Sequence, residues 1–186
     1  MAAHEIAEQR FGTGEPTALR EQVTVGAMDL VLAGGNLASV TWHGVEIVRG
    51  INCLVRDEDW GTYLPQQITE TRSLDPANGS FRYRRGFSIA EGGVSVAFDL
   101  MATPEGELVA SARLTAHRDF QTNRAGLTLL HPVNGIAGGA LEVTHPDGST
   151  ESVRFPRLIS PQQPVLAISG LSHEVRGIRG RDRIRR

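Results

Sequence analysis

Lysine is absent from this chain of 186 residues, and all 19 basic side chains are arginine. This absence excludes mechanisms that need a lysine amine, namely Schiff-base chemistry, a pyridoxal anchor and the lysine of a P-loop. Cys53 is the single cysteine, so no disulfide can form within the chain. Because Cys53 lies in the apolar run 51–55, we interpret it as a small buried hydrophobe and not as a nucleophile.

The motifs of several common enzyme classes are also missing. The sequence contains no G-x-S-x-G elbow, no glycine-rich dinucleotide fingerprint and no H-E-x-x-H zinc motif. Residues 1–10 lack the basic start and apolar stretch of a secretory signal, and no window is apolar enough to span a membrane. The sequence therefore predicts no cofactor, no metal, no membrane partner and a cytoplasmic location.

Glycine, by contrast, occurs at 21 positions, between many short runs in which apolar residues alternate with polar ones. Residues 94–101 and 108–116 place apolar side chains at every second position, as strands with one buried face do. Turn-forming segments such as 103–106 and 146–148 separate the runs. About ten to twelve strands follow from this pattern. We predict an all-β fold, specifically an antiparallel β-sandwich or curved supersandwich.

The composition changes abruptly at the carboxyl end. Residues 176–186 contain six arginines and one acid, whereas the whole chain has a net charge of -2. We therefore divide the chain into a flexible segment (residues 1–20), a β-sandwich domain (21–175) and a basic tail (176–186) that we expect to be disordered. Because the tail has no lysine and no aromatic residue, we expect no nucleic-acid partner.

Three histidines, His117, His131 and His145, follow one another at intervals of fourteen residues. This spacing would allow them to align on neighbouring strands as a three-histidine metal site. However, His145 lies in a predicted turn and His131 precedes Pro132. We therefore favour ordinary hydrogen bonds of these histidines at the ends of sheets.

Two polar segments contain groups that suit a sugar. Asp119, Asn123 and Arg124 follow a predicted strand and offer an acceptor, an amide and a guanidinium to the hydroxyls and carboxylate of a sugar acid. Asp59 and Trp60 follow another strand, and an aromatic face can stack on a sugar ring. Each segment also has a structural interpretation, which we favour: the first braces a sheet corner, and Trp60 anchors a turn in the core.

Five motifs resemble, in the same order, the N-terminal region of the D-apionate lactonase family. They are VRGI at 48–51, VRDEDWGTY at 55–63, DFQTNRAGL at 119–127, LHP at 130–132 and FPRLISP at 155–161. The resemblance covers about residues 23–175. It implies a galactose-mutarotase-like β-sandwich that is followed, in longer members, by a barrel-like domain and a further β domain. Because the sequence departs from the family pattern after Val175, the resemblance implies a truncated sandwich without the barrel.

Family members hydrolyse the lactone of the branched sugar acid D-apionate. The resemblance implies that this chain is an accessory domain that contacts a sugar-acid lactone or another carbohydrate, packs on a catalytic barrel and is inactive alone. It assigns no catalytic residue within the matching segment. The candidate substrate-binding residues are Asp59, Trp60, Asp119, Asn123, Arg124 and His131.

Two other functions stay open at this point. A self-sufficient mutarotase-like enzyme would need His117 or His131 to meet Glu107 or Glu142 on one face of a sheet. A noncatalytic carbohydrate-binding module would expose aromatic side chains on a sheet face, and aromatics make up 5% of the chain. A truncated domain, in contrast, would leave an apolar face open to solvent where its missing neighbours pack.

Overall fold

The computed structural model describes residues 18–158 and 165–184. Every regular element within these ranges is a β-strand, which confirms the all-β prediction. No helix in these ranges is long and apolar enough to cross a membrane. The predicted flexible segment lies outside the described residues up to position 17. The strands are β1 (Arg20–Val25), β2 (Met28–Ala33), β3 (Asn36–Trp42), β4 (Val45–Val48), β5 (Gly50–Arg56), β6 (Gln66–Leu74), β7 (Phe81–Ile89), β8 (Val94–Ala102), β9 (Leu108–Ala116), β10 (Arg124–Leu130), β11 (Ala140–Thr144), β12 (Thr150–Arg154), β13 (Gly170–Val175) and β14 (Ile178–Arg183).

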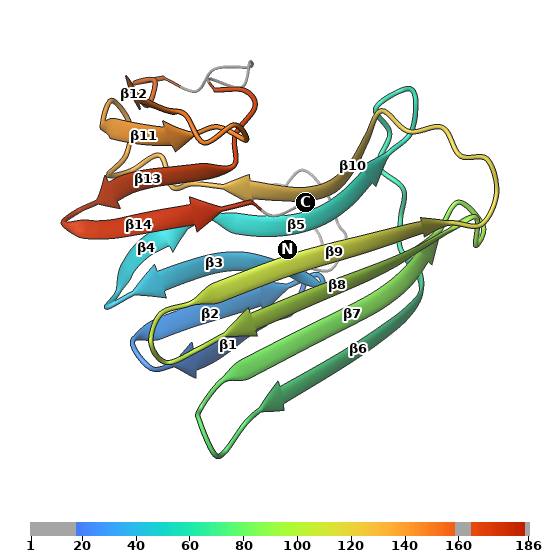
Figure 1. Ribbon diagram of the computed structural model, residues 1–186. Helices are drawn as coiled ribbons and strands as arrows, with labels where there is room; N and C mark the ends of the chain where they lie inside the picture. The colour runs from blue at the N-terminus through green and yellow to red at the C-terminus, as the bar shows by residue number, and fades with distance from the viewer. Residues whose placement is uncertain (1–17, 159–164, 185–186) are drawn as a thin grey trace, which may run out of the picture.

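These strands form three sheets (Figure 1). The main sheet has the order β1-β2-β3-β5-β10, with β4 paired to β3; the second sheet has the order β6-β7-β8-β9; and the small sheet has the order β12-β11-β13-β14. All the strand pairs are antiparallel. The main and second sheets pack on each other, and the small sheet lies beside β4 and the end of β10 (Figure 1). The predicted antiparallel sandwich is therefore confirmed.

The core lies between the main and second sheets. Leu30 and Leu37 of the main sheet are fully buried against Tyr83 and Phe98 of the second sheet. The rings of Tyr83 and Phe98 meet edge to face, with their centroids 6.2 Å apart. Burial of the larger side chains contributes about 1.5–3 kcal/mol each before chain entropy is subtracted, so this layer supplies most of the stabilisation of the sandwich.

Cys53 packs against both hydrophobic clusters of the core and is half-buried. Burial raises the pKa of its thiol from 9.0 to about 11, although the nearby Arg85 acts in the opposite direction. A thiol with this pKa stays protonated at neutral pH and is a poor nucleophile. The packing of Cys53 against the core agrees with its interpretation as a small hydrophobe, although the residue is half-buried and not fully buried.

Glycine-containing turns close one end of the sandwich. Gly26, in the turn between β1 and β2, has a φ of 58° and lies directly against Pro104 in the turn between β8 and β9. Gly106, in that second turn, has a φ of 95° and leaves room for the Trp42 indole. The loops that follow β5 and β9 lie at the other end, and the candidate pocket forms there.

The prediction of a disordered basic tail is wrong for residues 176–184. They continue the fold as β14, which pairs residue for residue with β13. Arg176 and Gly177 both have positive φ, as a two-residue hairpin turn requires. The arginines of β14 point outward, whereas Ile178, Gly180 and Asp182 are less exposed. The high arginine content obscured a period of two, which is the actual signal of the strand.

Candidate functional site

The pairing of β5 with β10 brings the two predicted polar segments together. Arg56 at the end of β5 lies opposite Arg124 at the start of β10. The Thr122 hydroxyl donates to the Arg56 carbonyl oxygen at 2.7 Å, and the backbone N–H of Asn123 donates to the same oxygen at 3.1 Å. Segments that lie about 60 residues apart in the sequence thus become the two walls of one site.

An open pocket of about 590 Å³ lies between these walls. The rings of Tyr63 and Phe120 form an apolar side, with their centroids 5.4 Å apart. Four carboxylates and one arginine line the pocket, so it has an acidic excess. The lining residues are Asp57, Glu58, Asp59, Tyr63, Ala90, Arg118, Asp119, Phe120 and Gln121.

The acids of the pocket differ in what they already bind. One carboxylate oxygen of Asp57 accepts the backbone N–H groups of Asp59 and Gly61, at 3.1 and 2.6 Å, and so shapes the loop. Within the described residues, no hydrogen bond or ion pair engages the side chains of Glu58, Asp59 or Asp119. These three carboxylates are free to accept hydrogen bonds from the hydroxyl groups of a ligand.

The prediction that Trp60 anchors a turn in the core is wrong. Its side chain is 54% exposed, and its backbone has a positive φ of 68°. The Arg124 guanidinium carbon lies 5.9 Å from the centre of the Trp60 ring, in a cation–π contact. The structural role expected of Asn123 is present, because its side-chain amide donates to the Glu58 carbonyl at 3.4 Å. A role of these residues in binding substrate stays a prediction.

His131, the sixth candidate residue, lies elsewhere. It follows the last residue of β10, and the length of that strand separates it from the pocket by about 20 Å. His117 instead bonds Ser95 at 2.7 Å, and His145 bonds the Ala167 carbonyl at 2.8 Å. The expectation of ordinary hydrogen bonds is confirmed for these two, and the described chain does not join the three histidines in a metal site.

The pairs required by a mutarotase do not form either. Glu107 comes directly before β9 and His117 directly after it, so the two lie at opposite ends of one strand. Glu142 is exposed on the small sheet opposite Ser152 and Ser172. Within the described ranges, no ion pair or hydrogen bond joins His117 or His131 to either glutamate. The geometry therefore gives the mutarotase alternative no support.

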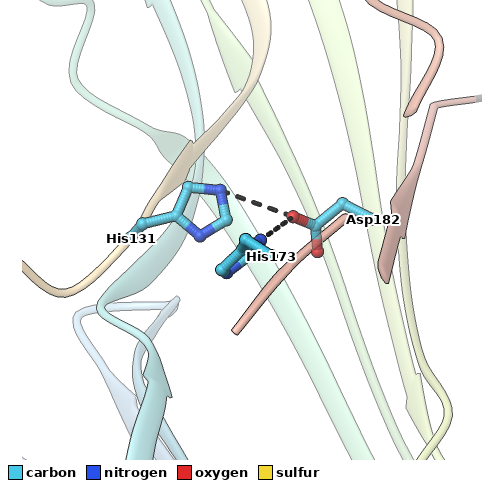
Figure 2. A group of neighbouring side chains, drawn as sticks. All are labelled: His131, His173 and Asp182. Carbon is cyan, nitrogen blue, oxygen red and sulfur yellow. Dashed lines mark ion pairs between the residues drawn. The ribbon is translucent and has the colours of Figure 1, made fainter. Parts of the chain in front are cut away.

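His131 belongs to a second cluster, formed with His173 and Asp182 (Figure 2). His173 lies on β13 and Asp182 on the neighbouring β14, and both point toward His131 at the end of β10 (Figure 2). The two imidazole rings are perpendicular, with their centroids 4.7 Å apart, and Phe155 packs beside them. The Asp182 carboxylate lies 3.4 Å from Nε2 of His131 and 4.0 Å from Nδ1 of His173.

The cluster is largely shielded from water. The His173 side chain retains 3% of its exposure and that of His131 retains 14%. Burial lowers the pKa of both histidines below 6.5, although the Asp182 carboxylate acts in the opposite direction. Both rings are therefore neutral at neutral pH. Sequence reasoning missed this cluster because Asp182 lies in the segment interpreted as a disordered tail.

The buried histidines predict a loss of stability in mild acid. Their pKa values are lower in the folded chain than the ordinary 6.5, so the unfolded chain binds protons first as the pH falls. Their contribution is therefore complete above pH 6.5 and decreases below it. In metal-free buffer, we expect the urea concentration at the midpoint of unfolding to be lower at about pH 5.5 than at about pH 7.5. A His173→Asn variant will show a smaller fall; an equal fall would contradict this assignment.

Comparisons with known proteins agree with the resemblance that the motifs indicate. The family described as D-apionate lactonase, N-terminal domain, matches residues 8–183. A D-apionate lactonase of Brucella anthropi is 34% identical over 166 residues, which are 88% of this chain and 27% of that relative. No solved structure matches the chain.

The family match also corrects one expectation. It extends to residue 183, so the sequence does not depart from the family after Val175, and β14 is part of the shared domain. The chain spans about a quarter of the length of the relative from Brucella anthropi. The family match takes in almost the whole of this chain, residues 8–183 of 186. This chain therefore belongs to the D-apionate lactonase N-terminal domain family.

Proposed function

We propose that this chain is the N-terminal domain of a sugar-acid lactone hydrolase, that its pocket holds the lactone, and that it does not catalyse hydrolysis alone. The observation that carries the proposal is the acidic pocket, whose lining residues Asp59 and Tyr63 flank the exposed Trp60 in one loop, although Trp60 itself does not line the pocket. Its free carboxylates suit the hydroxyls of a sugar, and Trp60 offers a face for the ring. The family name of the matching relative supplies the class of ligand.

The chemistry of the pocket suits binding better than hydrolysis. Hydrolysis of a lactone needs a base that activates water and donors that stabilise the developing oxyanion. Arg118 is the single cation among the lining residues, and its guanidinium already donates to the Ala90 carbonyl at 2.6 Å. An acidic pocket also disfavours the carboxylate that hydrolysis produces. The pocket is thus suited to the neutral lactone and to release of the product.

The open edge of the sandwich offers a place for the rest of a longer protein. Leu127 and Leu129 of β10 pair with Cys53 and Ile51 and share their inward face, yet they remain 42% and 37% exposed. Exposed apolar side chains at a sheet edge are typical of a surface that another domain covers. We propose that the catalytic barrel domain of longer family members packs on this edge.

The test compares the purified 186-residue chain with the full-length relative from Brucella anthropi, using the lactone of D-apionate. We expect turnover by the relative, no turnover by the short chain, and binding of lactone by the short chain. Replacement of Trp60 by Ala or of Asp59 by Asn will weaken that binding about tenfold. Glu107→Gln, an acid at the closed end of the sandwich, is the matched control and will bind normally.

Two outcomes would contradict the proposal. Turnover by the short chain at the rate of the relative would place the catalytic groups within this domain. A folded short chain that binds no lactone would show that the pocket is not a substrate site. Equal binding of the lactone and of sugars that are not lactones would instead favour a general carbohydrate-binding module. The exposed Trp60 also suits that function.

A further inference from the structure

The cluster of His131, His173 and Asp182 contains buried polar atoms that make no hydrogen bond. One ligand-type atom from each of the three side chains lies within 4.8 Å of the others. Nδ1 of His173 and the nearer carboxylate oxygen of Asp182 are buried without any hydrogen bond, and so is Nδ1 of His131, the ring nitrogen other than the one nearest to Asp182. Three such atoms in one place are rare in proteins, because unsatisfied buried polar groups are costly. They indicate a site built for an occupant.

The spacing of these atoms fits a tetrahedral metal ion. Bonds of 2.0–2.1 Å to nitrogen and carboxylate oxygen place neighbouring ligands of a tetrahedron about 3.3–3.4 Å apart. An octahedral ion would bring neighbouring ligands to about 3 Å. The distance from Nε2 of His131 to the Asp182 oxygen is 3.4 Å, and that from Nδ1 of His173 is 4.0 Å. The ligand atoms all lie within 4.8 Å of one another, so the histidine side chains would move closer to the carboxylate and to each other when they close on an ion.

We propose that His131, His173 and Asp182 bind one zinc ion, with water at the fourth position. Among the described residues, no fourth ligand-type side chain joins the three. His131 and Asp182 retain 14% and 24% of their exposure, so the ion is reached from their side. Two imidazoles and one carboxylate with an open position are an established zinc-binding set. Neutral rings are ready to coordinate, and Asp182 offsets part of the charge.

The position of the ligands gives the ion a structural consequence. His131 ends the last strand of the main sheet, whereas His173 and Asp182 belong to the small sheet. One ion would therefore join two sheets that otherwise share few contacts. The site lies at the far end of β10 from the pocket, so this proposal does not depend on the proposed lactone-binding function.

The experiment titrates the metal-free 186-residue chain with Zn²⁺ in competition with a coloured chelator, and counts bound metal. We expect one ion per chain and a rise of several degrees in the thermal midpoint when Zn²⁺ is added. Asp182→Asn, which keeps the shape of the side chain, and His131→Gln will each weaken binding by at least about 100-fold. Co²⁺ in place of Zn²⁺ will give the strong visible absorption of a tetrahedral ion.

His117→Gln and His145→Gln are the matched controls, because both histidines lie outside the cluster, and neither change will alter the affinity. Circular dichroism confirms that each variant is folded. The proposal is overturned if the folded wild-type chain binds no stoichiometric Zn²⁺, or if binding survives Asp182→Asn and His131→Gln. Binding that disappears with a control variant would likewise overturn it. The expectation from the sequence, that no metal binds, would then hold.

Discussion

Replacement of Phe98 by alanine will lower the free energy of unfolding by about 3–5 kcal/mol. Phe98 retains 2% of its exposure and packs edge to face on Tyr83 in the core. Alanine removes the ring from the middle of the layer between the two sheets, and the surrounding strands cannot close the cavity because both sheets are fixed by their ladders. Urea unfolding monitored by circular dichroism measures the loss at unchanged slope.

Phe120→Ala is the control for this change. Phe120 is a phenylalanine of the pocket wall that is only partly buried, so the same truncation will cost less than about 2 kcal/mol. Because the two variants remove identical atoms, their difference isolates the depth of burial. Equal losses in the two variants would show that the layer between the sheets is not the main core.

The parts of the fold that follow from local pattern were predictable. In β8, the buried residues are Val94, Val96, Phe98, Leu100 and Ala102, and the alternation in the sequence indicates this face. The turn at 103–106 joins β8 to β9, as its turn-forming residues predict. A period of two and a turn residue act over a few positions, so one sequence contains them in full.

Pairing between distant strands could not be predicted in the same way. Val55 of β5 pairs with Ala125 of β10, 70 positions further along the chain. The alternation of each strand is compatible with many partners, and register depends on the packing of the whole sheet. The two walls of the pocket were therefore each noticed as polar segments, whereas their meeting in one site required the structure.

The second cluster shows a further limit. His131 was a candidate residue, but its partners are Asp182 on β14 and His173 on β13. One signal in the sequence could have indicated Asp182. It is the single acid at an inward position of a strand whose outward positions are arginines. An acid on the inward face of a strand needs a partner there, because burial of an unpaired charge is costly.

Replacement of Gly26 by alanine will destabilise the domain by about 2–4 kcal/mol, which makes it the other large effect expected in this protein. A methyl group at this position would lie 2.5 Å from the Pro104 carbonyl oxygen and 2.8 Å from the Pro104 Cα. Both atoms belong to the backbone of the turn between β8 and β9, so no side-chain rotation relieves the overlap. The φ of 58° adds strain for any residue with a Cβ.

Gly44→Ala separates the two contributions. Gly44 also lies in a hairpin turn, with a φ of 77°, but a methyl group there would meet nothing within 4 Å. This variant will lose only the cost of the backbone conformation, about 1 kcal/mol. The remaining difference from Gly26→Ala then measures how firmly the turn between β1 and β2 presses on the turn between β8 and β9. Equal losses would mean that the two sheets can separate slightly at this end, and that the contact between Gly26 and Pro104 does not fix the closed end of the sandwich.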